Sequence, residues 1–172
     1  MTRFQSEKAN ATACQTLVDL GLSIHNSAGP SEQNSMLDIY AALHNTKGGV
    51  LGRVNKPQEA LQHTKHFLDA QHRLCSAAGG VPSSKLAAAY SELALAHLAC
   101  GDTDEVLSLL KESSTIRRGL PTFTPTDLYN PLRYEGLYHI HRRDWTEAER
   151  CFLKAMQDRQ DRYGLDDDRT PR

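Results

Sequence analysis

The sequence predicts an all-α protein, an α-α superhelix of about seven antiparallel helices. No segment rich in valine, isoleucine or threonine alternates apolar and polar residues with the period of two that strands show. Apolar residues recur instead at three- and four-residue spacing, as at Leu86, Ala89, Leu93 and Ala94. Breaks rich in glycine, proline and asparagine divide these segments, and one helical unit recurs three times along the chain.

The breaks define the individual helices. Pro57 suits the first turn of a helix, and Gly164 suits a helix end. The expected helices span residues 3–26, 34–54, 57–78, 83–100, 103–118, 127–142 and 145–163. Turns of two or three residues join the second helix to the third, the fourth to the fifth and the sixth to the seventh. Such short turns force the joined helices to pack antiparallel, as hairpins.

Three regions follow from this division. Residues 1–28 form an N-terminal capping helix, residues 29–163 form three helical hairpins, and residues 164–172 form a flexible C-terminal tail. The capping helix has no clear partner helix, so it is either a cap or the second half of an incomplete repeat. One of its sides is apolar through Ala9, Ala13, Leu17, Leu20 and Ile24.

The repeated segments begin at His44, Tyr90 and Leu132, so their starts lie 46 residues apart (44 to 90) and then 42 (90 to 132). In each segment a small residue on the first helix is expected to face a small residue on the second, which lets the two helices approach closely. These pairs are Gly48 with Ala60, Ala94 with Val106, and Gly136 with Ala148. Bulky residues are expected to fill the space between neighbouring hairpins: Phe67, Leu110, Trp145 and Phe152.

The third segment contains Gly136, Trp145, Ala148, Phe152 and Ala155, and the run DWTEAERCFLKA. With these residues the chain resembles the tetratricopeptide repeat (TPR) family over roughly residues 34–163. The family unit is about 34 residues, so the longer spacing here is similar to the kinesin-light-chain type of repeat. The other two segments depart from the family pattern at Lys47, Pro57 and Val106.

The resemblance implies a non-catalytic scaffold or adaptor that binds a peptide segment in its concave groove, because first helices line that groove in the family. The expected groove residues are Asn45, Arg53, Ser91, Leu95, Arg133, Leu137 and His141. The two arginines favour a protein or peptide partner with acidic residues. The alternative is that both arginines are ordinary solvated surface charges.

Two other function classes stay open. The last helix is amphipathic through Trp145, Ala148 and Phe152, and a helix that covers it is expected to be missing. The chain would then be a self-associating structural or regulatory subunit, a homo-oligomer that docks through its C-terminal helix. An enzyme whose site the sequence does not reveal is the third class.

Charge and motifs argue against other activities. Lysine plus arginine (20) nearly balances aspartate plus glutamate (21), whereas a nucleic-acid-binding module usually has a basic excess. No apolar run is long enough for a signal peptide or a membrane span, so we expect a cytoplasmic chain with reduced cysteines.

Known ligand-binding motifs are also missing. No HExxH or zinc-finger spacing occurs, and His63 and His66 are expected to be surface or edge histidines. The glycines of KGGVLGR lack the lysine-serine ending and the preceding strand of a phosphate-binding loop. We therefore expect no cofactor, no metal ion and no catalytic residues.

Overall fold

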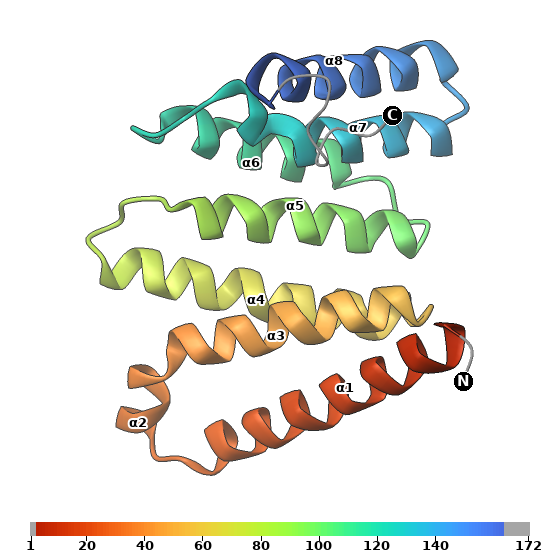
Figure 1. Ribbon diagram of the computed structural model, residues 1–172. Helices are drawn as coiled ribbons and strands as arrows, with labels where there is room; N and C mark the ends of the chain where they lie inside the picture. Colours follow the sequence, from red (N-terminus) through yellow and green to blue (C-terminus); the bar gives the residue numbers. More distant parts are fainter. Residues whose placement is uncertain (1–2, 164–172) are drawn as a thin grey trace. The chain divides into compact units, whose positions relative to one another are not determined.

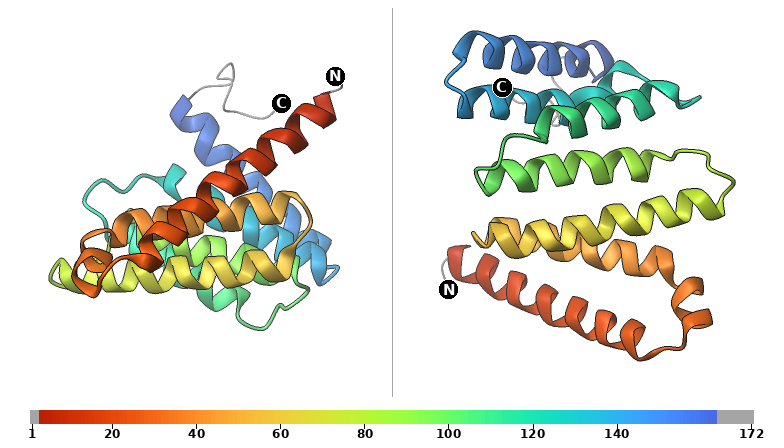
Figure 2. Two further views of the ribbon diagram at one scale, coloured as in Figure 1. Left: turned by 90° about the horizontal axis from the view of Figure 1, so that it is seen from below. Right: turned by 180° about the vertical axis from the view of Figure 1, so that it is seen from behind.

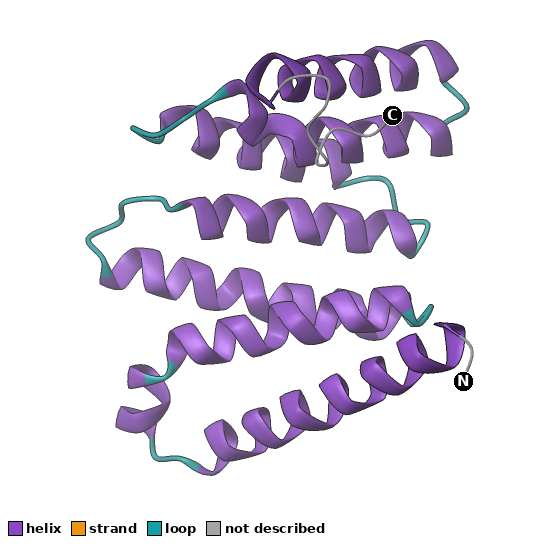
Figure 3. Ribbon diagram, viewed as in Figure 1, coloured by secondary structure: helices purple, strands orange, loops and turns teal. Residues whose placement is uncertain are grey.

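The computed structural model describes residues 3–163, in which helices are joined by turns and loops and no strand occurs (Figures 1 and 3). The all-α prediction is confirmed. The chain divides into two compact units, residues 1–81 and residues 82–172, and each is described by itself. The tail predicted at residues 164–172 lies outside the described residues.

The first unit contains α1 (Arg3–Ser27), α2 (Pro30–Ser35), α3 (Leu37–Arg53) and α4 (Pro57–Ala77). Helices α3 and α4 form a hairpin, and α1 packs obliquely on α3 (Figure 2). Gly48 allows the hairpin to close, because a Cβ atom there would lie 3.2 Å from Cγ2 of Thr64 and 3.5 Å from the carbonyl oxygen of Ala60. The predicted contact between Gly48 and Ala60 is confirmed.

Helix α1 uses only part of its apolar surface to pack. Val18 and Leu22 are buried, and Asp19 forms an ion pair with Lys47 of α3. The predicted apolar side is exposed, with Leu17 at 69%, Leu20 at 58% and Ile24 at 56%. Ala13 is exposed as well, and the side chain of Ala9 lies outside the described part of the chain.

The second unit contains α5 (Ser84–Ala99), α6 (Val106–Gly119), the short 3-10 helix η1 (Pro125–Leu128), α7 (Tyr129–His141) and α8 (Trp145–Tyr163). Helices α5 and α6 form one hairpin and α7 and α8 another, and α7 also contacts α5 and α6. A Cβ atom on Gly136 would lie 2.8 Å from the ring of Phe152. The glycine therefore allows the close approach of α7 and α8 that the sequence predicts, but its nearest atoms belong to Phe152 and not to the expected Ala148.

The same turn closes all three hairpins. Its central residue has a positive φ, 60° at Asn55, 76° at Gly101 and 60° at Arg143. The next N–H donates to the carbonyl five residues back, as a Schellman motif does: Lys56 to Leu51 at 2.9 Å, Asp102 to His97 at 3.0 Å and Asp144 to His139 at 2.9 Å. The turns are 46 residues apart (55 to 101) and then 42 (101 to 143), which matches the spacing of the repeated segments.

Several helix boundaries differ from the prediction, most clearly in two places. The helix expected at 34–54 is two helices, because Met36 leaves helical geometry (φ −103°, ψ 15°) and Pro30 begins α2 earlier in the chain. The loop before α7 contains η1, which begins at a capping box in which the N–H of Thr124 donates to Asp127 at 2.7 Å.

The predicted packing of Trp145 between neighbouring hairpins is wrong. Phe67 and Leu110 are buried as expected, at 4% and 3% exposed, but Trp145 is 63% exposed. It is the first residue of α8, and among the described helices α8 contacts only α7 and η1. Among the described residues, the rest of the α8 surface is therefore uncovered, and no neighbouring hairpin packs against the indole ring.

Candidate functional site

The two first helices of the second unit, α5 and α7, are in contact. Leu95 of α5 and Leu137 of α7 are half-buried, and His141 at the end of α7 is exposed. Arg133, Leu137 and His141 follow one another at four-residue spacing, so they lie along one side of α7. We call Leu95, Arg133, Leu137 and His141 the α5–α7 face.

Arg133 is the charged group of this face. Its guanidinium carbon lies 4.7 Å from the centre of the Tyr134 ring, a cation–π contact. The Nε atom of Arg133 is buried and has no hydrogen-bond partner among the described residues. A buried donor without an acceptor costs about 1–3 kcal/mol.

Tyr134 holds the neighbouring helices in place. Its hydroxyl donates to a carboxylate oxygen of Glu92 on α5 at 3.1 Å. Burial, followed by the nearby Glu92 carboxylate, raises the pKa of Tyr134 to about 12. The phenol therefore stays protonated as a donor near neutral pH, and it ties α7 to α5 beside Arg133.

Ser91 differs from the expectation for a groove residue. It is 1% exposed, and its hydroxyl lies 2.7 Å from the hydroxyl of Ser113 on α6. Ser113 in turn donates to the carbonyl of Ala87 at 2.7 Å. Ser91 therefore points into the α5–α6 contact, where a peptide cannot reach its side chain.

The remaining predicted groove residues, Asn45 and Arg53, lie on α3 of the first unit. Both are exposed. Leu95, Arg133 and Leu137 thus belong to the second unit, and Asn45 and Arg53 belong to the first.

His63 and His66, expected at the surface or its edge, are half-buried and exposed respectively, and the structure places both against a third histidine that the sequence did not link to them. His44 of α3 is only 6% exposed, and its Nδ1 lies 2.8 Å from Nδ1 of His63 on α4. The rings of His66 and Tyr40 also pack on His44, with ring centres at 4.7 Å and 4.4 Å. Burial first, and then the neighbouring cationic groups, lower the pKa of His44 to about 3. The pKa of His63 is lowered for the same reasons.

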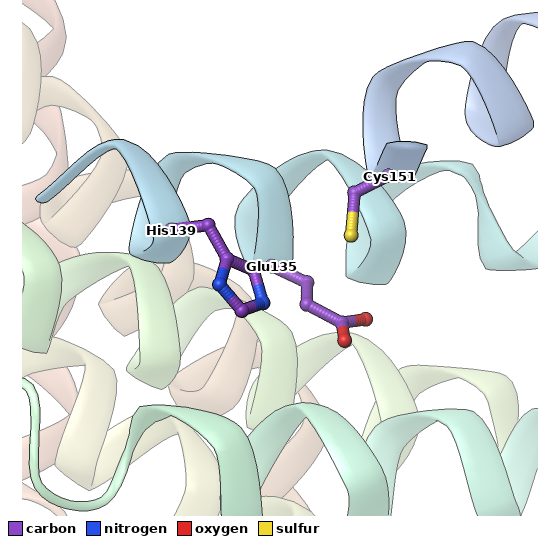
Figure 4. A group of neighbouring side chains, drawn as sticks. All are labelled: Glu135, His139 and Cys151. Carbon is purple, nitrogen blue, oxygen red and sulfur yellow. The ribbon is translucent and has the colours of Figure 1, made fainter. Parts of the chain in front are cut away.

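A second unnoticed group lies between α7 and α8. Glu135 and His139 of α7 and Cys151 of α8 place one ligand atom each within 4.8 Å of one another (Figure 4). His139 Nδ1 also lies 3.7 Å from a carboxylate oxygen of Asp144 in the turn. The four-residue spacing of Glu135 and His139 was visible in the sequence, whereas the approach of Cys151 depends on the α7–α8 hairpin.

Glu135 also lines a hollow of about 330 Å³ on the second unit. Four leucines line the hollow together with two basic residues, Lys111 and Arg118. Glu135 therefore borders an open space and is not enclosed in the core.

No protein-family model matches this chain, and no curated protein sequence matches it. Among solved structures, the crystal structure of BtubC (BKLC) from P. vanneervenii is similar, with a TM-score of 0.70 and 21% sequence identity. The match covers 95% of this chain and 61% of that chain, so the present chain spans less than two thirds of the length of BtubC. At this identity the likeness shows the fold alone, a TPR-like helical solenoid, and the predicted fold class is confirmed.

Proposed function

We propose that this chain is a non-catalytic protein-interaction module that binds a peptide segment carrying acidic residues on its α5–α7 face. The TPR-like fold supports a scaffold or adaptor role, because repeats of this kind present long first-helix surfaces to partners. Asn45 and Arg53 on α3 offer contacts of the same kind in the first unit.

The proposal rests on the contacts and burial of the Arg133 side chain. Its guanidinium lies over an aromatic ring, its Nε donor is buried without a partner among the described residues, and half-buried Leu137 follows it on the same side of α7. A peptide carboxylate would pair with the half-buried guanidinium, and apolar peptide side chains would cover the leucines.

The proposal includes a cytoplasmic location. The four cysteines, Cys14, Cys75, Cys100 and Cys151, are free, which suits a reducing compartment. Among the described residues, no helix has both the length and the apolar character needed to cross a membrane.

The test is an array of fluorescein-labelled acidic peptides with leucine or phenylalanine at the centre, read by fluorescence anisotropy. Peptides that bind the wild type should lose affinity by about tenfold or more in Arg133→Glu, since a charge-paired contact is replaced by repulsion. Arg142→Glu is the matched control, because Arg142 is exposed just beyond the end of α7 and carries the same charge change. Equal loss in both variants, or no binding by any acidic peptide, would contradict the proposal.

Self-association through α8 is the second candidate. Trp145 and Leu153 of α8 are 63% and 59% exposed, more than large apolar side chains usually are in a covered helix. If copies dock here, sedimentation velocity should show dimers whose population falls in Trp145→Glu/Leu153→Glu. The control is Leu17→Glu/Leu20→Glu, the same change on the exposed side of α1. A wild type that stays monomeric at high concentration would exclude this candidate.

A further inference from the structure

We propose that Glu135, His139 and Cys151 form a binding site for a zinc-like divalent metal ion between α7 and α8. The three side chains supply a carboxylate oxygen, an imidazole nitrogen and a thiolate sulfur, which are the ligand types that zinc takes in proteins. They come from two helices of one hairpin, so the hairpin itself sets their approach (Figure 4).

The distances suit a small ion. The three ligand atoms lie within 4.8 Å of one another. Around a tetrahedral zinc ion, with bonds of about 2.0–2.3 Å, ligand atoms lie roughly 3.5 Å apart. Side-chain shifts of about 1 Å would therefore close the site, and the fourth position is left for water.

The internal repeat gives independent support. Glu135, His139 and Cys151 occupy the positions that Leu93, His97 and Leu109 occupy in the second repeated segment. Leu93 and Leu109 are buried at 6% and 9% exposed, as the repeat architecture requires. In the third segment the two leucines are thus replaced by metal-ligand types on either side of the shared histidine.

Glu135 is the costly replacement without an ion, because a buried neutral thiol such as that of Cys151 behaves as a small apolar side chain. Cys151 is 2% exposed. Glu135 is half-buried and forms no ion pair within 4.0 Å among the described residues. A bound cation would pair with this carboxylate and favour the thiolate, so that the same two groups attract a common partner.

The surroundings suit a metal ligand. Asp144 lies 3.7 Å from Nδ1 of His139, slightly beyond hydrogen-bond distance, so a small side-chain shift would let the carboxylate accept a proton from Nδ1 while Nε2 keeps its lone pair. A carboxylate behind a ligating histidine is a common supporting contact in zinc sites. Of the three ligands, Glu135 lines the hollow on the second unit.

The test uses cobalt(II) as a spectroscopic probe on the full-length, reduced protein. One equivalent of cobalt(II) should produce near-ultraviolet charge-transfer absorption from a cobalt–thiolate bond, and one equivalent of zinc(II) should remove it. The histidine cluster around His44 cannot give this signal, because its members have no thiol. Cys151→Ser should abolish the band, and Cys100→Ser, which changes a cysteine outside the group, should leave it unchanged.

A second variant separates metal loss from misfolding. Glu135→Leu/Cys151→Leu restores the residues of the second repeated segment, so it should fold with unchanged helical circular dichroism and bind no cobalt(II). Zinc(II) should raise the melting temperature of the wild type but not of this variant. Asp144→Asn should weaken binding about 10- to 100-fold.

The proposal is overturned if the wild type gives no thiolate band, if the band survives Cys151→Ser, or if zinc(II) stabilises the double variant as much as the wild type. Peptide binding by the α5–α7 face is measured separately, and its failure would not affect these outcomes.

Discussion

At the scale of single residues, the space around each glycine of the first helices decides how a larger side chain there would change stability. Gly136 lies against Phe152, whereas a Cβ atom on Gly49 would meet nothing within 4 Å. Both are glycines inside a helix, and each costs about 0.5–1 kcal/mol relative to alanine in backbone entropy. Only Gly136 has a packing contact that offsets this cost.

The two glycines should therefore respond to leucine with opposite signs. Gly136→Leu should lower the free energy of unfolding by about 1–3 kcal/mol or more, because the new side chain overlaps the Phe152 ring. Gly49→Leu should raise it by about 0.5–1 kcal/mol, because leucine favours the helix. Urea denaturation followed by circular dichroism measures both, and an unchanged Gly136→Leu would refute the close α7–α8 contact.

His44 predicts a pH dependence of the first unit. Its folded pKa of about 3 lies below its ordinary value of 6.5, so the unfolded chain binds the proton more readily. Stability is then complete above about pH 6.5 and falls as the pH drops toward 3, by at most about 1.4 kcal/mol per pH unit. The neighbouring groups Lys47, His63, His66 and His25 act in the same direction.

The measurement is urea denaturation at pH 7 and pH 5, with His44→Gln compared to the wild type. Glutamine does not titrate, so the variant should lose less stability between the two values. His72→Gln is the matched control, because His72 is exposed on the same helix as His63. Equal losses in wild type and His44→Gln would show that other groups cause the acid sensitivity.

At the scale of elements, the positive φ in the shared hairpin turn predicts opposite effects on stability for two substitutions. A non-glycine residue at φ 60° is strained by roughly 1 kcal/mol, and Arg143 is exposed at this position. Arg143→Gly should therefore raise the free energy of unfolding by about 0.5–1 kcal/mol, and Gly101→Ala should lower it by a similar amount. Thermal unfolding of both variants tests this, and a stabilising Gly101→Ala would contradict the assigned turn geometry.

The helices themselves could be predicted well from the sequence, because spacing and breakers are local signals. The helix at 145–163 and the one beginning at Pro57 agree with the structure, and the helix expected at 3–26 ends one residue later, at Ser27. The break at Met36 could not be foreseen, since methionine is an ordinary helix residue and its backbone is set by the packing around it.

The candidate sites were harder to predict, because a site depends on which side of a helix meets a neighbour. Ser91 is polar but buried by a hydroxyl pair, and Trp145 is apolar but exposed. Cys151 reaches Glu135 and His139 only through the turn between α7 and α8. Comparison of the repeated segments position by position carries a usable signal, since Leu93 and Leu109 become Glu135 and Cys151.

At the scale of the whole molecule, the chain consists of two units that meet in sequence at Val81–Pro82. The linker follows α4 with Gly79 and Gly80, both at positive φ, and Val81 is 69% exposed. Exposed segments with glycine are preferred sites of proteolysis. The division therefore predicts where the native protein is cut first.

Limited digestion with elastase should cleave first within residues 77–80 and release two fragments that resist further cutting. The turn at Val54 is the internal control, because it is also exposed and ends in the same kind of hydrogen bond as Gly80 N–H to the Cys75 carbonyl, but it joins two helices of one unit. Mass spectrometry of the early fragments identifies the cut. First cleavage inside α4 or α5 would contradict the division into two units.

The recurrence of one joint in three hairpins has an evolutionary consequence. Asn55, Gly101 and Arg143 close their turns with the same backbone geometry although their side chains differ. Because the backbone rather than the side chain forms these bonds, gene duplication could copy a hairpin and splice it in without reshaping the junction. Core leucines of a copied hairpin could then be replaced by side chains that bind a ligand, while the backbone of the hairpin stays the same.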